Sequence, residues 1–362
     1  MDFAVTPEQE ALRRTARDYL RDRYPLDALA SLADPVPGWD ARSWPELVAL
    51  GWLDPDLGPV ELGLLAEEAG YALQPGPWLP TVALAAPAFR AAGDYPVVPA
   101  TLAWSEPTPG PRRLTAAVGD VRCRARAGTV TGRKIDVPAG ADVSAVVVVA
   151  HGADGVELHL VDPLTAGVEV AGATVDPTRP SANLDLSGTP ARALVPAGRA
   201  AQVLCQTRVW ALALLACEAV GVARRALDLA CGHAKTRTQF GRPIGANQAV
   251  SHPLAEVYAS VELARSLAYR AAWSVSATTA GSSEAVLTAT VAARRAARDA
   301  CEAAIQTLGG IGFTWEHPIH RWYRRALWHD SFEGSPSDLR AELAALLLDG
   351  AVEGDLLAAA AR

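Results

Sequence analysis

The sequence predicts an α+β multidomain protein in which a helical N-terminal domain, a β domain and a helical C-terminal domain follow one another. Apolar residues recur at helical spacing in the first part of the chain and again after Gln206, whereas short β-branched runs lie between these parts. A Pro-rich stretch at 106–111 marks the first change of pattern. We therefore expect domains at 1–103, 104–203 and 204–362.

The N-terminal domain opens with a strong helix start. Thr6 is a suitable N-cap, Pro7 suits the first helical position, and Gln9 lies three residues after the cap. Apolar spacing predicts further helices near 44–50 and 60–73.

The β domain is predicted from short runs rich in β-branched residues. Two such runs, 143–150 and 156–161, are separated by Gly, Asp and other turn residues, as strands are.

The C-terminal domain is predicted to be a bundle of long helices. Gly309 and Gly310 follow Leu308 as a helix C-cap, and Ser335 with Pro336 resembles the start of a final helix. The long helical segments are expected near 207–236, 252–277, 283–308 and 336–348.

Composition excludes several classes of protein. The 362 residues are 50% hydrophobic and 20% charged, which is enough for a large core. The formal charge of −7 is spread without a basic stripe, which argues against nucleic acid and against an anionic membrane surface as partners. The most apolar stretch, 209–223, is shorter than the roughly 20 residues that a bilayer needs, so we expect a buried helix.

The cysteines and the N-terminus favour a cytoplasmic protein. The five cysteines are odd in number and include no C-x-x-C pair, and the first residues lack the basic and apolar regions of a signal peptide.

Three tracts in the C-terminal domain carry residues suited to chemistry. The glycines of 306–314 would let backbone amides approach a phosphate or a ring, although a helix C-cap and turn explains them equally. Arg237, in the basic tract 235–244, could hold a pyrophosphate or merely stabilise a helix end. Glu333 lies among apolar and aromatic neighbours, where a carboxylate has a raised pKa and can act as a base, although most single glutamates are capping or solvated.

Taken in order, these tracts resemble the C-terminal half of the acyl-CoA dehydrogenase family, and the actinobacterial type in particular. The family shows R-x-x-F-G-x-x-I, then Q-x-x-G-G-x-G, then [YF]-E-G-[TS]. The tract 318–333 also matches the family's P-x-x-x-x-x-R-x-A and E-G spacing without a gap. Nearer the N-terminus, 44–47, 64–70 and 104–107 resemble further family segments.

The resemblance implies a β-barrel or sandwich in the middle domain and a four-helix bundle in the C-terminal domain. It implies FAD as cofactor, with Glu333 removing the α-proton of an acyl thioester while hydride leaves the β-carbon for flavin N5. By the same resemblance, Arg324 would contact substrate, pair with a neighbouring carboxylate or order the Glu333 segment, although an ordinary helix-surface arginine explains it equally. The residues implied to bind the cofactor are Arg237, Phe240, Gln248, Gln306, Gly309, Gly310, Ser105 and Ser335.

The sequence departs from the family pattern at the expected flavin wall. Ile135-Asp136-Val137 stands where the family usually has W-I-[TS], and Asn247 precedes Gln248 where Phe-Gln is common. Two alternatives therefore remain open. The chain could be a non-catalytic or half-site subunit of a heteromeric acyl-CoA dehydrogenase, or a flavin oxidase or oxygenase of the same fold.

The partners implied are an acyl-CoA or carrier-protein thioester from fatty acid or sterol side-chain metabolism, and an electron-transfer flavoprotein as acceptor. A homo- or hetero-oligomer, either a dimer or a tetramer, is also implied. We expect no metal site, because His317, His320 and His329 lie close together in sequence without a cysteine or carboxylate to complete a ligand set.

Overall fold

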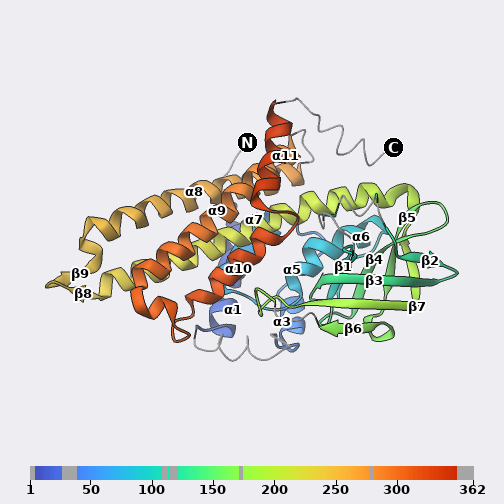
Figure 1. The fold of residues 1–362 in the computed structure, drawn as a ribbon, viewed down its shortest axis with the longest axis horizontal. Coiled ribbons are helices and arrows are strands. Elements are labelled where there is room, and N and C mark those ends of the chain that lie inside the picture. The colour runs from blue at the N-terminus through green and yellow to red at the C-terminus, as the bar shows by residue number, and fades with distance from the viewer. Residues whose placement is uncertain are drawn as a thin grey trace. The chain divides into compact units, whose positions relative to one another are not determined.

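The computed structural model describes residues 5–26, 39–107, 113–114, 119, 121–170, 174–277 and 281–348 (Figure 1). The chain forms two compact units. Unit 1 comprises 1–31, 58–74 and 212–343, and unit 2 comprises 32–57, 75–211 and 344–362. Helices precede and follow a region of strands, so the predicted fold class is confirmed. The domain boundaries at 103 and 203 stay a prediction.

Unit 1 begins with helix α1 (Pro7–Arg23), which starts at the predicted cap. The Gln9 amide donates to Thr6 Oγ1 at 3.2 Å, and the Thr6 amide donates to Gln9 Oε1 at 3.0 Å. These reciprocal bonds satisfy two backbone donors that the first turn would leave open. Ala16 and Leu20 bury the apolar face of the helix.

Glycines let helix α4 (Pro59–Ala72) approach helix α7 (Ala197–Thr236) closely within unit 1. A Cβ at Gly70 would lie 2.1 Å from the Glu218 carbonyl oxygen, and one at Gly221 would lie 1.9 Å from the Glu67 carbonyl oxygen. Neither position has room for a larger residue, so the two glycines set the distance between the helices.

The helices that follow α7 form the bundle of unit 1. Helix α9 ends at Leu308, and Gly309 closes it at φ 65° as the predicted C-cap. The helix at 319–331 was not among the long helices expected from the sequence. The helices are α8 (Gln248–Ser276), α9 (Ser282–Leu308), α10 (Ile319–Ser331) and α11 (Pro336–Leu348).

Within the described residues, α7 alone is long and apolar enough to cross a membrane. Of its most apolar window, 83% is buried inside the protein. It is therefore the core helix that the 209–223 stretch predicted.

The sheet of unit 2 closes into a barrel. Strand β4 pairs with β2, β2 with β3, β3 with β7, β7 with β5, and β5 again with β4. Strand β1 pairs in parallel with β4, and β6 pairs with β7. The strands are β1 (Ala100–Ala103), β2 (Arg124–Arg126), β3 (Thr129–Pro138), β4 (Ala145–His151), β5 (Val156–Val161), β6 (Gly167–Val170) and β7 (Ser181–Val195).

Short helices of unit 2 precede the sheet. Trp52 and Trp78 pack edge to face with ring centroids 5.1 Å apart, and Trp210 Nε1 donates to the Val82 carbonyl at 2.8 Å. The helices are α3 (Ser43–Ala49), α5 (Trp78–Pro80), the π-helical turn η1 (Thr81–Ala85) and α6 (Ala86–Ala91).

Candidate functional site

Glu333 lies in the turn between α10 and α11 and is only 2% exposed. Its backbone has φ 59°, and Gly334 after it has φ 111°. The left-handed conformation costs a residue with a Cβ roughly 1–2 kcal/mol, so surrounding contacts must hold it. The sequence predicted the apolar surroundings of this carboxylate but not its backbone conformation.

Arg294 of α9 holds both sides of this turn. Its Nη2 donates to the Phe332 carbonyl at 2.8 Å, and its Nη1 donates to the Gly334 carbonyl at 3.4 Å. The arginine is itself 2% exposed. The Trp328 ring stacks on Phe332 with centroids 5.3 Å apart and planes at 29°. A charged donor and an aromatic stack therefore fix the segment that carries Glu333.

Ser335 caps α11 on the far side of the turn. The Asp338 amide donates to Ser335 Oγ at 3.2 Å, while the Ser335 amide donates to Asp338 Oδ2 at 2.9 Å. The predicted capping role is confirmed. The proposed contact of Ser335 with a cofactor, and that of the half-buried Arg324 on α10 with substrate, stay predictions.

Helix α10 is anchored to α7 by a buried ionic cluster. Arg325 Nη1 lies 2.6 Å from Glu218 Oε1, and His329 Nε2 lies 3.0 Å from Glu218 Oε2. All three side chains are at most 1% exposed. In the sequence Glu218 stands alone as a carboxylate within the apolar stretch 209–223, and this isolation is the signal that it needs a buried partner.

The first group of predicted cofactor residues lies on a hairpin after α7. Strands β8 (Thr238–Gln239) and β9 (Arg242–Pro243) flank Phe240 and Gly241, whose φ values are 52° and 80°. Phe240 is 97% exposed. Arg237 before the hairpin and Gln248 at the start of α8 are exposed as well.

The second group lies at the end of α9. Gln306 and Gly310 are exposed and Gly309 is half-buried. A Cβ at either glycine would meet no atom within 4 Å, so neither glycine is required by packing within the chain. The 3₁₀ turn η5 (Gly309–Phe313) then leads toward α10.

The chain alone does not bring these two groups against Glu333. In Figure 1 the hairpin and the end of α9 lie at the left end of unit 1, and α10 runs back from there toward α11. Helix α10, which lies between η5 and the Glu333 turn in the chain, has 13 residues and is therefore about 20 Å long. The exposed hairpin and the exposed end of α9 therefore both lie apart from the carboxylate.

Ser105 belongs to unit 2 and follows β1. It is 7% exposed, and its buried hydroxyl oxygen makes no hydrogen bond within the described part of the chain. Glu106 beside it accepts from Lys134 Nζ at 2.6 Å. Burial would raise the pKa of the Glu106 carboxyl, but Lys134 and the amides of Cys123 and Arg122 hold that pKa below its ordinary value.

The segment 135–137, which departs from the family's W-I-[TS], also has an irregular backbone. Between Lys134 and Val137 the pairing of β3 with β7 shifts register, and Asp136 between them has φ 51°. The Asp136 amide donates to Asn183 Oδ1 at 3.2 Å. A bulge of this kind redirects the side chains next to it.

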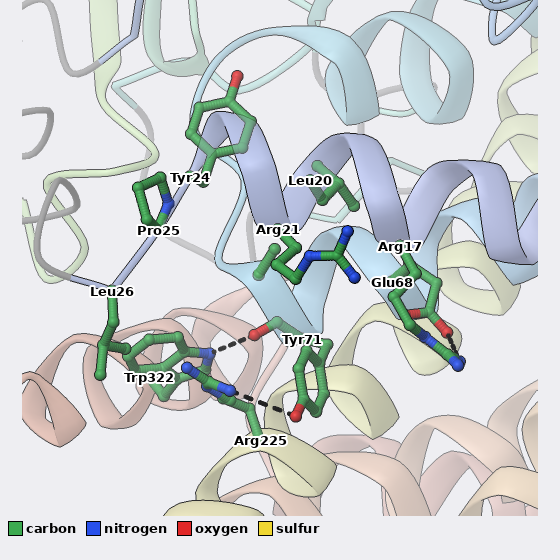
Figure 2. A pocket seen from close by; sticks show the side chains of 11 residues that line it. Arg17, Leu20, Arg21, Tyr24, Pro25, Leu26, Glu68, Tyr71, Arg225 and Trp322 are labelled. Carbon is green, nitrogen blue, oxygen red and sulfur yellow. Dashed lines mark hydrogen bonds and ion pairs between the residues drawn. The ribbon is translucent and has the colours of Figure 1, made fainter.

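A pocket of about 250 Å³ opens elsewhere in unit 1, and Figure 2 shows its lining. Arg225 lies over the rings of Tyr71 and Trp322, at 5.0 and 5.6 Å from their centroids. Arg17 pairs with the buried Glu68 at 2.7 Å. Charges in the wall are therefore matched by neighbours, and none of the predicted site residues lines this pocket.

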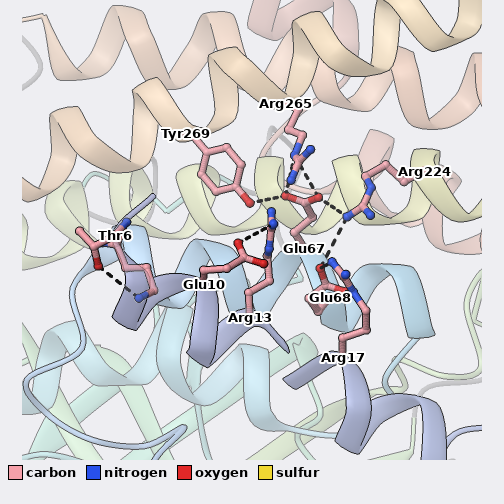
Figure 3. A network of polar contacts seen from close by, with 10 residues as sticks. Thr6, Glu10, Arg13, Arg17, Glu67, Glu68, Arg224, Arg265 and Tyr269 are labelled. Atoms are coloured by element: carbon pink, nitrogen blue, oxygen red, sulfur yellow. Dashed lines mark hydrogen bonds and ion pairs between the residues drawn. The ribbon is translucent and has the colours of Figure 1, made fainter. Parts of the chain in front are cut away.

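A second ionic network, drawn in Figure 3, surrounds Glu67 of α4. Arg224, Arg265 and the Tyr269 hydroxyl all contact the Glu67 carboxylate, which is 1% exposed. Burial, and then the Glu67 charge, raises the pKa of Tyr269 well above its ordinary value, so its hydroxyl stays a donor. The network ties α4 to α7 and α8 and was not foreseen, although adjacent glutamates within an apolar helix signal it.

Among the residues that the structure describes, no group of three or more His, Cys, Asp or Glu side chains is placed to hold a metal ion. His329 is committed to the Glu218 cluster. His317 Nδ1 accepts from the Ile319 amide at 3.2 Å, near the start of α10.

Comparisons with known proteins match most of the chain. A family model described as "Acyl-CoA dehydrogenase, C-terminal domain" matches residues 200–348. Over 352 residues the chain is 34% identical to the acyl-CoA dehydrogenase FadE34 of Mycobacterium tuberculosis, an alignment that covers 90% of this chain and 46% of FadE34. The chain thus spans about half the length of such curated relatives.

Solved structures share the fold over nearly the full length. The steroid ACAD Tcur3481-Tcur3483 is 27% identical, with a TM-score of 0.83 and coverage of 96% of this chain and 99% of that one. The ChsE4-ChsE5 complex of Mycobacterium tuberculosis is 24% identical, with a TM-score of 0.82 and the same coverage.

Proposed function

Since the chain belongs to the acyl-CoA dehydrogenase family, we propose that it is an FAD-dependent enzyme that introduces an α,β double bond into an acyl thioester. The observation that carries this proposal is the Glu333 turn. A buried carboxylate, held in a left-handed conformation by Arg294 and followed by a capped helix, is the preorganised base that such a reaction needs.

In the proposed reaction Glu333 takes the proton from the α-carbon of the thioester. FAD, when bound, supplies two-electron chemistry by accepting hydride at flavin N5 from the β-carbon. The α and β carbons are left joined by a double bond. Phe332, next to Glu333 in the chain, and Trp328, stacked on Phe332, would help to keep water from the carboxylate and so favour proton transfer from carbon.

The residues present fit FAD in part. Ser105 offers a buried hydroxyl that finds no partner within the described chain, and Gly309 and Gly310 leave open backbone that a pyrophosphate or adenosine can approach. Arg237 and Gln306, both exposed, would hold the polar part of the cofactor, with Phe240 and Gln248 beside them. Ser335, already engaged with Asp338, would contribute only through its remaining hydrogen-bond capacity.

A second candidate function is that of a partner subunit in a heteromeric enzyme. The exposed Phe240 and the open glycines suit a cofactor shared with a neighbouring chain. The bulge at Asp136, where the family has W-I-[TS], weakens one wall expected for the flavin. The solved relatives Tcur3481-Tcur3483 and ChsE4-ChsE5 are each named for two proteins, which makes this arrangement worth testing directly.

The test begins with the purified chain alone. Its visible absorption reports bound FAD, and anaerobic mixing with thioesters of linear, branched and sterol side-chain acids reports bleaching of the flavin. We expect bleaching by the wild type and none by Glu333→Gln, because an amide cannot accept the α-proton. Glu316→Gln removes an exposed carboxylate and is the matched control that should bleach as the wild type does.

Each alternative has its own outcome. A colourless chain that becomes yellow and active only with a second chain would replace the proposal with the partner-subunit function. Oxygen consumption without an added electron carrier would indicate an oxidase, whereas transfer to an electron-transfer flavoprotein supports the dehydrogenase. Carrier-protein thioesters in the panel decide between carrier and CoA substrates.

The proposal includes a cytoplasmic location, and it rests on five free cysteines within the described chain. Fractionation of cells that express the native gene tests it, and recovery in the membrane or the medium would refute it.

A further inference from the structure

Arg294 is an unusual residue for the interior of helix α9. Its neighbours Ala293, Ala296 and Ala297 are buried alanines, and the arginine is 2% exposed among them. Burying a guanidinium is costly unless its donors are used, so its position calls for a specific role.

The two carbonyls that Arg294 contacts flank Glu333 on either side. Nη2 reaches the Phe332 carbonyl at 2.8 Å and Nη1 reaches the Gly334 carbonyl at 3.4 Å. Two parallel donors on one rigid guanidinium plane fix the orientation of both peptide groups. The peptide groups that carry these carbonyls bracket Glu333 and Gly334, so the two bonds restrain the backbone angles of both residues, including φ 59° at Glu333 and φ 111° at Gly334.

We infer that Arg294 is a positioning residue that holds the Glu333 carboxylate in the orientation needed to remove the α-proton. This inference rests on the proposed function, because it assigns a role in the same reaction. Arg294 acts through the backbone of the turn. Its contribution therefore appears in the proton-transfer step more than in the binding of the acyl thioester.

The experiment compares holoenzymes carrying Arg294→Met, Arg294→Lys and Arg298→Met. Methionine keeps much of the side-chain volume without donors, and lysine restores one charged donor. Arg298 lies one turn further along α9 and pairs with Asp330 at 3.1 Å, so its variant controls for loss of a cation on the same helix. Flavin content, thioester dissociation constant and the limiting rate of flavin bleaching are measured for each.

We expect Arg294→Met to lower the limiting bleaching rate roughly 10- to 100-fold, the loss that follows when charged hydrogen bonds to a reacting segment are removed. The thioester dissociation constant should change by less than about threefold, and Arg294→Lys should recover part of the rate. Amide hydrogen exchange in 332–335 should become faster in Arg294→Met, while Arg298→Met leaves rate and exchange unchanged.

The two proposals fail in different ways. If none of the thioesters bleaches the flavin of the wild type, the proposed function is refuted and the positioning role is refuted with it. A wild type that bleaches while Arg294→Met bleaches equally fast refutes only the positioning role. Equal losses of flavin, thioester affinity and rate in Arg294→Met and Arg294→Lys would show a general structural role in its place.

Discussion

The buried pair of Lys134 and Glu106 in unit 2 offers a sharp test of how the barrel is stabilised. Lys134 Nζ lies 2.6 Å from Glu106 Oε1 and also donates to the Trp104 carbonyl at 3.3 Å. The lysine is completely buried. Lys134→Met removes the cation and leaves the Glu106 carboxylate with the amide donors of Arg122 and Cys123.

Breaking a buried ion pair from one side costs about 3–5 kcal/mol, because the remaining charge stays desolvated. The double variant Lys134→Met with Glu106→Gln has no stranded charge and should recover much of this loss. Arg133→Met, on the same strand, is the matched control. Its partner Glu169 is 2.9 Å away and both side chains are largely exposed, so its loss should cost about 0–1 kcal/mol.

The same pair predicts a dependence on pH. Burial would raise the Glu106 pKa, but Lys134 and the two amides lower it below the ordinary 4.5. A depressed carboxyl pKa contributes stability that is present above the ordinary value and is lost as pH falls through the folded value. Without Lys134 that pKa rises, so Glu106 contributes less acid-dependent loss in Lys134→Met than in the wild type. The difference in stability between the variant and the wild type should therefore shrink as pH falls and the stranded carboxylate is protonated.

Urea unfolding followed by circular dichroism and by tryptophan fluorescence measures these differences. Because the chain has two units, both probes are needed to show whether one transition or two occur. A loss in Lys134→Met no larger than that in Arg133→Met would refute the reasoning. So would a double variant as unstable as Lys134→Met, since the stranded carboxylate would then not be the cause.

Two further outcomes follow from packing and from thiol burial. Gly221→Ala should lower the melting temperature strongly, because its Cβ would lie 1.9 Å from the Glu67 carbonyl oxygen. Gly232→Ala on the same helix is the control, because its Cβ would meet no atom within 4 Å, and it should raise the free energy of unfolding by up to about 1 kcal/mol. Equal melting temperatures for the two variants would contradict this reasoning. Brief treatment of the native protein with iodoacetamide should label the half-buried Cys231 before Cys217, because complete burial raises the pKa of the Cys217 thiol and shields it from the reagent. Peptide mass spectrometry measures the order of labelling, and labelling of Cys217 first would contradict the prediction.

Local rules of sequence predicted several elements well. Three helix caps each involve partners within a few residues, so the sequence itself shows which residues form their hydrogen bonds. These caps are Thr6 with Gln9, Ser335 with Asp338, and Gly309.

Helix α10 was missing from the predicted long helices for a physical reason. Its buried face includes Arg321, Arg325 and His329 beside Trp322 and Ala326, so the apolar periodicity that marks a helix is hidden. Arg325 and His329 are buried with Glu218 of α7 as their partner, and a sequence pattern cannot show a partner on another helix.

The sequence alone determined the order of helices, strands and helices, and the place of Glu333 before a capped helix, because periodicity and capping act over a few residues. Only the tertiary structure decided that Glu333 is left-handed and buried, and that Arg294 holds its neighbours. The carbonyl of Phe332 lies 38 residues from that arginine in sequence. Such bonds form only when packing of the apolar faces has brought α9 against the turn, so they are consequences of the fold as a whole.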